Sequence, residues 1–237
     1  MHIAAVDNMA NNGNSFIHRV QPLTKVCVSF LFLASLIFSN HIYKAILLLL
    51  VPILFILLSK VDFKEILHLA LYPVIFSLLF ALIQLQQSWM AAVLVMIKAI
   101  GAALNMLVLI TTTPYTDIFA VFSYVLPGVI VDIFIFTYRS LFILLDSIDS
   151  MLRNIRLRGG FHPMRLLFNL KNIAGALGVM IIHAFEMSER LYRIYSLRGY
   201  NGKIHITRER TPMQIEDILL LIFSLIVLTG VLIPWSI

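Results

Sequence analysis

Long apolar segments separated by short polar turns dominate the first half of the chain and return near its end. A hydrocarbon core about 30 Å thick needs roughly 20 apolar residues per helix, and fewer where flanking side chains reach the interface. The pattern therefore predicts five transmembrane helices, with the ranges Leu23–Phe38, His41–Ser59, Ile66–Leu85, Trp89–Thr112 and Ile215–Trp235. For the last helix, Thr211 is a candidate N-cap and Gln214 can complete a capping box.

The composition supports a membrane class. Of the 237 residues, 60% are hydrophobic and only 13% are charged, and the mean hydropathy is +0.95. A soluble domain carries about a quarter charged residues. We therefore predict an all-α integral membrane protein. Its single cysteine, Cys27, excludes an internal disulfide.

The uneven placement of basic residues predicts the orientation of the chain. The segment between the fourth and fifth predicted spans holds 12 of the 18 lysines and arginines, whereas Lys44 lies in a turn on the opposite side. Because positive residues favour the cytoplasmic side, we predict that the N-terminus and this middle segment are cytoplasmic and the C-terminus is outside. No basic block is interleaved with aromatic residues, so no nucleic-acid partner is expected. The predicted regions are 1–112 (N-terminal tail and four membrane helices), 113–212 (cytoplasmic or interfacial helices) and 213–237 (last membrane helix).

The stretch Gly128–Leu145 is apolar enough to span a membrane, but the charges argue against it. If it spanned and Asn172–Phe185 returned, five basic residues would lie outside, against the positive-inside tendency. The returning stretch is also short and contains two glycines. We therefore predict that both stretches belong to interfacial helices below the bilayer. The five basic residues are Arg153, Arg156, Arg158, Arg165 and Lys171.

Two parts of the middle segment have the apolar periodicity of amphipathic helices, at steps of three and four. Their opposite faces carry charge pairs at i,i+4, Asp149 with Arg153 and Glu189 with Arg193. Each such pair contributes only about 0.2–0.5 kcal/mol, so the pairs support a solvated face. The stripes are Leu141, Leu144, Leu145, Ile148, Met151, Leu152 and Ile155, and Leu177, Met180, Ile181, Ala184, Met187, Leu191 and Ile194.

These two helices end alike. A shift of forty residues aligns Leu157-Arg158-Gly159 with Leu197-Arg198-Gly199, and it also aligns the two charge pairs. Glycine after the last helical residue is an ordinary C-cap, and arginine in the last turn favours the helix dipole. A cap requires neither a matching leucine nor matching charges, so the repetition favours two docking points for a partner with two equal sockets.

With these paired tips the chain resembles a known family. X-Arg-Gly tips at the ends of two long cytoplasmic helices, after four N-terminal spans, resemble the transmembrane coupling (T) component of energy-coupling factor transporters. The stretches "VDNMANNGNSFIHRVQPLTK", "TTPYTDIF" and "SLRGYNGK" resemble more specifically the cobalt-importing branch of that family, the CbiQ type. The resemblance covers nearly the whole chain.

The resemblance implies a coupling subunit of an ATP-driven importer in the cell membrane. In that family the arginine tips sit in grooves on two ATP-binding cassette ATPase subunits, and they transmit motion to a separate membrane-embedded substrate-binding subunit. Many members have alanine before the arginine, where this chain has leucine. The implied ATPase-coupling residues are Leu157, Arg158, Gly159, Leu197, Arg198 and Gly199.

No cofactor is expected on this chain. It has no Gly-x-x-x-x-Gly-Lys-Ser/Thr phosphate loop, so ATP and magnesium are expected on the partner subunits. Its seven histidines show no paired metal-ligand spacing. We therefore expect a non-catalytic subunit without a metal site.

Lys98 and Asn105 are polar residues within the fourth predicted span, with Gly101 on the same helix face. A charge inside the membrane marks a functional site by default, but small and polar residues also serve the packing of membrane helices. Packing against another helix is favoured over a role in transport.

Two other functions fit parts of the sequence. The same coupling role could serve nickel or a vitamin, because a separate subunit selects the cargo. A membrane enzyme acting on lipid or isoprenoid phosphates would use arginines to bind phosphate. Such an enzyme also needs clustered acidic metal ligands, and the carboxylates here are scattered.

Overall fold

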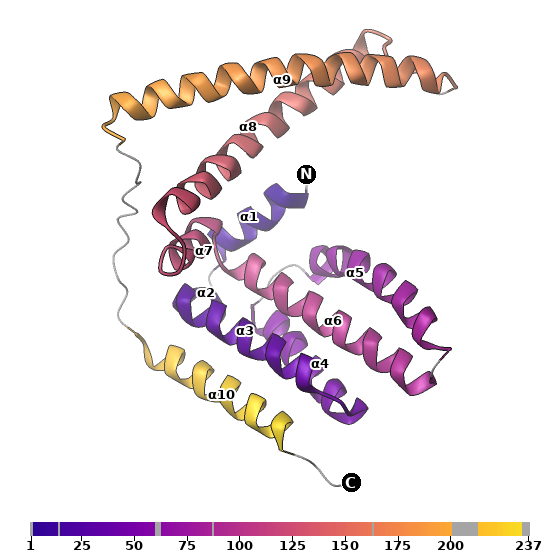
Figure 1. Ribbon diagram of the computed structural model, residues 1–237, viewed down its shortest axis with the longest axis vertical. Helices are drawn as coiled ribbons and strands as arrows, with labels where there is room; N and C mark the ends of the chain where they lie inside the picture. Colours follow the sequence, from indigo (N-terminus) through magenta and orange to yellow (C-terminus); the bar gives the residue numbers. More distant parts are fainter. Residues whose placement is uncertain are drawn as a thin grey trace. The chain divides into compact units, whose positions relative to one another are not determined.

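The computed structural model describes residues 2–13, 15–59, 63–86, 88–162, 164–200 and 213–233. Every regular element in these ranges is an α-helix (Figure 1). This confirms the predicted all-α class. In chain order the helices are α1 (His2–Asn12), α2 (Phe16–Arg19), α3 (Pro22–Phe38), α4 (Ile42–Ser59), α5 (Phe63–Gln84), α6 (Trp89–Thr112), α7 (Tyr115–Phe122), α8 (Gly128–Leu157), α9 (Leu166–Leu197) and α10 (Ile215–Leu232).

Five of the described helices are long and apolar enough to cross a membrane, namely α4, α6, α8, α9 and α10. Two shorter apolar helices are α3 and the His68–Gln84 part of α5. The chain is therefore a multi-pass, all-helical membrane protein. Length and composition qualify α8 and α9 as spans too, so their interfacial position stays a prediction.

The predicted membrane helices coincide with α3, α4, α5, α6 and α10 within a few residues at each described end. The last of them begins at Ile215, but its N-cap is Gln214, which forms a capping box with Asp217. The predicted cap Thr211 and the predicted end Trp235 lie outside the described residues. An acid at the third helical position serves this box well, because it accepts the N-cap N–H and faces the positive end of the helix.

The described residues divide into two compact units. The first contains α1 to α6, α7 up to Val121, and α10, and the second begins at Phe122 and contains α8 and α9.

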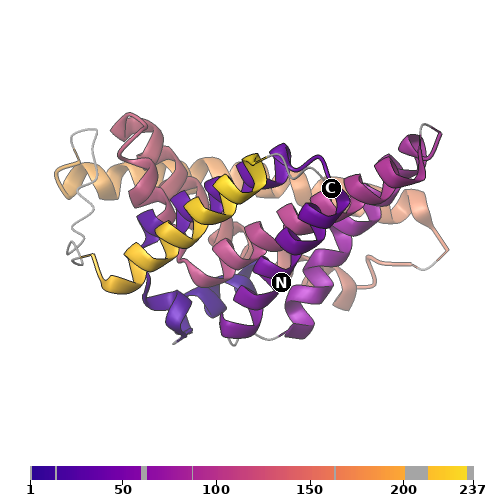
Figure 2. The ribbon, with the colours of Figure 1, turned by 90° about the horizontal axis from the view of Figure 1, so that it is seen from below.

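In the first unit, α6 packs against α3, α4 and α5, and α10 packs against α3. Figure 2 shows α10, in yellow, alongside the indigo α3. Two small apolar cores hold these helices together, and many other apolar side chains remain exposed, as expected for helices in contact with lipid. One core comprises Phe32, Leu36, Leu48 and Val231, and the other Ile56, Ile66 and Val108.

Hydrogen bonds to other parts of the first unit fix α10 at both of its ends. At its start, buried Asp217 accepts a hydrogen bond from the Gln21 backbone N–H at 2.8 Å, so one carboxylate joins the first turns of α3 and α10. At its end, the Lys44 ammonium donates to the carbonyl oxygens of Val231 and Ile233, each at 2.8 Å. Both contacts place a charge against the favourable end of the helix dipole.

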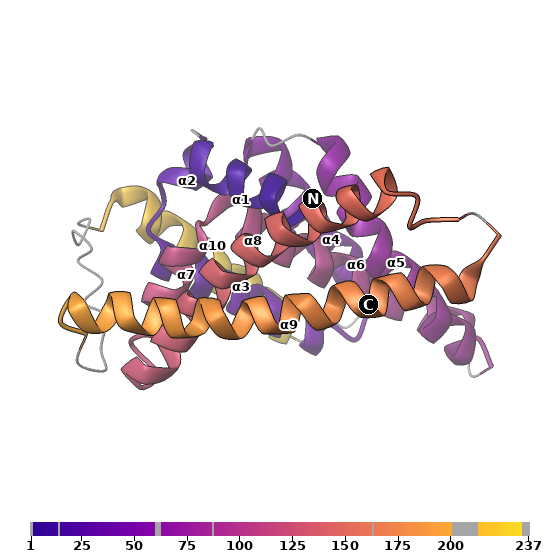
Figure 3. The ribbon, with the colours of Figure 1, turned by 90° about the horizontal axis from the view of Figure 1, so that it is seen from above.

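In the second unit, α8 and α9 form an antiparallel hairpin, and Figure 3 shows the two helices crossing obliquely. At about 1.5 Å per residue, their 30 and 32 residues give helices roughly 45 Å long. The Asn172 side chain near the start of α9 contacts Gly160 just after α8. The rings of Phe136 and Tyr195, whose centroids are 4.5 Å apart, join the first half of α8 to the end of α9.

Candidate functional site

The two repeated endings have the same backbone conformation. We call Leu157-Arg158-Gly159 the first tip and Leu197-Arg198-Gly199 the second tip. The φ and ψ angles are −86° and 11° at Arg158, and −86° and 8° at Arg198. The following glycines both adopt the left-handed conformation, with φ of 72° at Gly159 and 78° at Gly199. The sequence repeat is therefore also a repeat in structure.

Each tip is closed by the two hydrogen bonds of a Schellman motif. The outer bonds run from the N–H of Gly160 to Ile155 O at 2.8 Å, and from the N–H of Tyr200 to Tyr195 O at 3.0 Å. The inner bonds start at the N–H groups of the two tip glycines and measure 3.1 Å at both tips. The positive φ explains why glycine is needed, but nothing in the motif requires leucine or arginine.

The leucine and arginine side chains of both tips are exposed. Leu157 is 80% exposed and Leu197 is 89% exposed, and the arginine that follows each of them is exposed as well. No heavy atom lies within 4 Å of a Cβ built on Gly159 or Gly199. An exposed leucine next to an exposed arginine offers a partner both apolar area and a bidentate donor.

Only one of the two predicted charge pairs forms an ion pair among the described residues. The Arg193 guanidinium lies 3.6 Å from the Glu189 carboxylate, and both side chains are largely exposed. Asp149 and Arg153 are exposed and form no ion pair with each other within the described chain. An exposed ion pair stabilises a protein little, because its attraction is nearly offset by the entropy lost when two long side chains are held together. The paired and unpaired arrangements are therefore similar in free energy.

The first tip is connected to α9 through backbone and amide groups. Asn172 Nδ2 donates to the Gly160 carbonyl oxygen at 2.7 Å. In the turn that follows, Asn169 and the backbone of His162 exchange two hydrogen bonds, at 2.7 and 2.8 Å. No aromatic ring takes part in these bonds.

The second tip is connected to α8 through an aromatic cluster. The Tyr200 hydroxyl donates to Asp132 Oδ2 at 2.9 Å, and Arg139 Nη1 donates to the Tyr195 hydroxyl at 3.1 Å. The Phe136 ring packs against both tyrosines, with centroids 4.5 Å from Tyr195 and 5.8 Å from Tyr200. The hydrogen bond to the Asp132 carboxylate raises the pKa of Tyr200, because it stabilises the protonated phenol.

Two open clefts separate α8 from α9 between these connections. One, of about 700 Å³, is bordered by Arg158, Lys171 and Asn172. The other, of about 560 Å³, is bordered by Phe136, Tyr195 and Tyr200. The hairpin is therefore held mainly at its two ends, which leaves its middle free to adjust.

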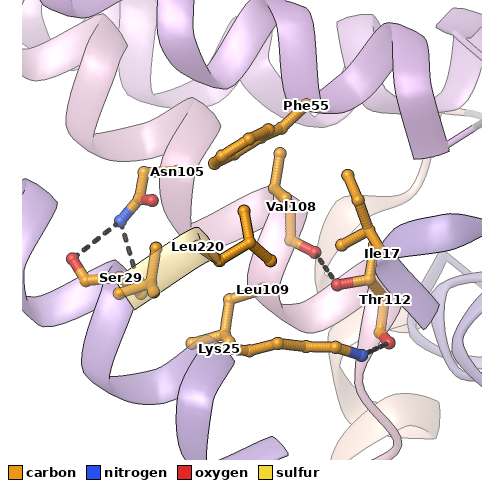
Figure 4. Close-up of a pocket in the computed structure, with 10 residues that line it drawn as sticks. Ile17, Lys25, Ser29, Phe55, Asn105, Val108, Leu109, Thr112 and Leu220 are labelled. Atoms are coloured by element: carbon orange, nitrogen blue, oxygen red, sulfur yellow. Dashed lines mark hydrogen bonds between the residues drawn. The ribbon is translucent and has the colours of Figure 1, made fainter. Parts of the chain in front are cut away.

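In the first unit, the face of α6 that carries Lys98, Gly101 and Asn105 lies against α3. Lys98 Nζ donates to the Ile37 carbonyl oxygen at 3.1 Å, in the last turn of α3. Asn105 Nδ2 donates to Ser29 Oγ at 2.7 Å (Figure 4), and a Cβ on Gly101 would lie 3.4 Å from the Leu36 side chain. These are contacts between α6 and α3 of the kind that small and polar residues make where membrane helices pack, and the choice between packing and transport stays a prediction.

A small cavity lies beside the contact between α3 and α6 (Figure 4). It is lined by Lys25, Ser29, Asn105 and Thr112 and by apolar side chains that include Phe55. Lys25 Nζ donates to the Thr112 carbonyl oxygen at 2.8 Å. The cavity measures about 40 Å³, room for roughly two or three water molecules. It is far too small for a vitamin.

The described residues contain no cluster of three or more histidine, cysteine, aspartate or glutamate side chains that could hold a metal ion. The sequence pattern singled out the tips and the charge pairs, but it did not connect the second tip with its partners Asp132, Phe136, Arg139 and Tyr195. The sequence feature that could have indicated this connection is Tyr200. It directly follows Arg198-Gly199, whereas Gly160 follows Arg158-Gly159 at the first tip.

Comparison with known proteins finds a family whose model, CbiQ (cobalt transport protein), matches residues 13–213. Two proteins of Methanocaldococcus jannaschii are also similar. The uncharacterized protein MJ1571 is 33% identical over 102 residues, which are 43% of this chain and 34% of that protein. The uncharacterized protein MJ1089 is 28% identical over 123 residues, which are 52% of this chain and 45% of that protein. The chain thus spans less than half the length of each of these relatives.

Proposed function

The chain belongs to the CbiQ family of cobalt transport proteins, and from this membership we propose that it is the coupling subunit of an ATP-driven importer of the energy-coupling factor type. As a family member it is a membrane component of a cobalt-type transporter. The finer proposal adds two ATPase subunits and a substrate-binding membrane subunit as partners, with ATP and magnesium held by the ATPases. The observation that carries it is the pair of exposed leucine-arginine tips with one backbone conformation.

The antiparallel hairpin supports a partner with two separate sockets. Arg158 follows the end of α8 and Arg198 follows the end of α9, so the tips lie at opposite ends of a hairpin roughly 45 Å long. One small groove could not receive both. A dimer of like ATPase subunits offers two equal grooves, and closure of the dimer would move the tips toward each other. The clefts between α8 and α9 would allow the hairpin to follow that movement.

The exposed apolar face of α9 supports a second partner in the membrane region. None of the residues of α9 is buried within the described structure, and Leu177, Ile181 and Phe185 are each more than half exposed. A helix with this pattern on the cytoplasmic side would need lipid or protein against that face. We propose that the substrate-binding subunit rests there and is tilted or released when the hairpin moves.

The proposed orientation follows from the basic residues. The hairpin and the N-terminus would be cytoplasmic and the C-terminus outside, because most lysines and arginines fall in the segment that contains the hairpin. Cysteine labelling of intact cells at positions 158 and 198 would test this. Labelling of the two positions from opposite sides of the membrane would refute the proposal.

The decisive variant combines Arg158→Glu with Arg198→Glu. We expect loss of copurification with the ATPase pair and loss of ATP-dependent cobalt uptake, while the chain still inserts in the membrane and remains monodisperse in detergent. The control is Arg190→Glu, which makes the same kind of charge change at an exposed position of α9 that borders neither of the two clefts. Undiminished uptake by the tip variant would contradict the coupling role.

Cargo is a separate question, because another subunit would select it. Uptake of labelled cobalt and nickel should be compared in cells that express this chain with its genomic neighbours. Preference for nickel would leave the coupling role intact and change only the cargo.

A further inference from the structure

We propose that Asp132, Phe136, Arg139, Tyr195 and Tyr200 form a latch that sets the direction of the second tip. This proposal rests on the proposed coupling function and names the residues that position one of its two arginines. The latch joins the first half of α8 to the end of α9. The first tip is attached differently, by the amide of Asn172.

The position of Tyr200 in the chain connects the latch directly to Arg198. Only one residue separates them, and the Tyr200 backbone N–H makes the outer bond of the Schellman motif. Its side chain reaches Asp132, which lies 68 positions away in sequence and is only 2% exposed. Tyr200 is therefore fixed at its backbone by α9 and at its hydroxyl by α8. The short loop that carries Arg198 is held from both sides.

The first tip shows that a helix ending of this kind does not need a tyrosine–aspartate contact. The residue equivalent to Tyr200 is Gly160, and a Cβ built there would lie 2.6 Å from Ile155 Cγ2 and 3.0 Å from Ile155 O. A tyrosine cannot occupy this position without rearrangement. The same Schellman motif forms at both tips, so the latch is not required to end the helix. Its separate effect is to fix the last turn of α9 on α8.

The chemistry of the contact suits a positioning role. A phenol that donates to a buried carboxylate makes a charge-assisted hydrogen bond, which is stronger and more directional than a neutral one. The rings of Phe136 and Tyr195, whose planes are tilted by 53°, add apolar contact without adding flexible side chains. The last turn of a helix otherwise frays, and Arg198 would then sample many directions before docking.

The first test measures the position of the second tip directly. Spin labels at Ile133→Cys and Ser196→Cys, both exposed sites, report the distance across the latch in the full chain reconstituted in lipid nanodiscs, with Cys27→Ser removing the native thiol. We expect Tyr200→Phe and Asp132→Asn each to broaden this distance distribution. A second label pair, Asn154→Cys with Leu166→Cys at the first tip, should stay unchanged. An unchanged distribution across the latch would overturn the proposal.

The second test connects position to function through a double-mutant cycle. In the complete transporter, Tyr200→Phe and Asp132→Asn should each lower uptake roughly three- to tenfold, and the double variant should lose no more than the more severe single variant. Tyr192→Phe, at a tyrosine of α9 that is 72% exposed, is the matched control and should have no effect. Broadened distances with full uptake would overturn the positioning role.

The outcomes separate this proposal from the one on which it rests. If Arg198→Glu abolishes uptake while Tyr200→Phe changes neither distance nor uptake, the latch is wrong and the coupling function stands. If Arg198→Glu leaves uptake intact, the coupling function fails, and with it the functional claim for the latch, whatever the labels report.

Discussion

The two tips share a backbone and differ in what holds them. Both end in a Schellman motif with almost the same torsion angles, and both expose a leucine and an arginine. The first is attached to its neighbour helix by the amide of Asn172, whereas the second is attached through two tyrosines and a buried aspartate. A repeated sequence can therefore reproduce a docking surface without reproducing its support. The surface and its support can be tested separately.

The largest expected effect comes from reversing one arginine at a time. Arg158→Glu alone and Arg198→Glu alone should each lower uptake by at least about a hundredfold, because a like charge at a complementary site costs several kcal/mol. Equal losses would sharpen the view that the tips are equivalent as docking points. Uptake assays in cells with all subunits would measure this, with Arg190→Glu as the control. A loss at only one position would break the equivalence.

A smaller effect is expected from the tip glycines. Gly159→Ala and Gly199→Ala should each destabilise the helix end by about 1–2 kcal/mol, because alanine is strained at positive φ. The cost should be the same at both tips, since no neighbouring atom crowds either position. Hydrogen exchange of the amides in the last turns of α8 and α9 would report it. Asparagine at the same positions should cost less, and clearly unequal costs would contradict the shared conformation.

High pH should loosen the second tip and not the first. The pKa of Tyr200 is raised above its usual value near 10, mainly by its hydrogen bond to Asp132. A raised pKa means that the stabilisation is fully present below the unfolded value and is lost as pH rises through the folded value. The 133–196 label distance should therefore be constant at neutral pH and broaden only above pH about 10, together with tyrosinate absorbance.

Two variants test the cause of that transition. Tyr200→Phe should remove the pH dependence of the distance, and Tyr192→Phe should preserve it. Broadening that begins near neutral pH would show that a group other than Tyr200 controls the contact.

The smallest expected effect comes from the charge pairs. Glu189→Gln removes the ion pair with Arg193 and should cost only about 0.2–0.5 kcal/mol at low salt. Asp149→Asn should cost less, because no ion pair links Asp149 to Arg153 in the described structure. Hydrogen exchange along α8 and α9 at low and at 1 M salt would distinguish them, since high salt should remove the difference. Equal effects would indicate that both pairs form in solution.

Much of the fold could be predicted from the sequence because membrane helices are defined by local apolar length. The predicted ranges Leu23–Phe38 and Trp89–Thr112 differ from α3 and α6 by one residue at most. The short helices α1, α2 and α7 were missed. Helices this short are not stable alone and depend on tertiary packing, which leaves a weak signal in the sequence.

The repeat identified both tips, but the latch could not be predicted. Asp132 and Tyr200 are separated by 68 positions, and no local period connects them. Asp132 and Tyr200 meet because α8 and α9 run antiparallel and are joined at both ends of the hairpin, which are far apart in sequence. Hydropathy also cannot decide whether α8 and α9 cross or lie beneath the bilayer, because both are long and apolar enough for either. That choice depends on charge and on partners.

The attachment of α10 bears on how a load on the hairpin is carried. The second unit is inserted in the chain between two parts of the first unit, so the chain connects it to the first unit twice, once after α7 and once before α10. Asp217 bonds the start of α10 to the start of α3, and Lys44 of α4 bonds the end of α10. A force on the hairpin would thus act on the first unit through both connections. At α10 it would pass to α3 and α4 through these hydrogen bonds, so α10 would not separate alone.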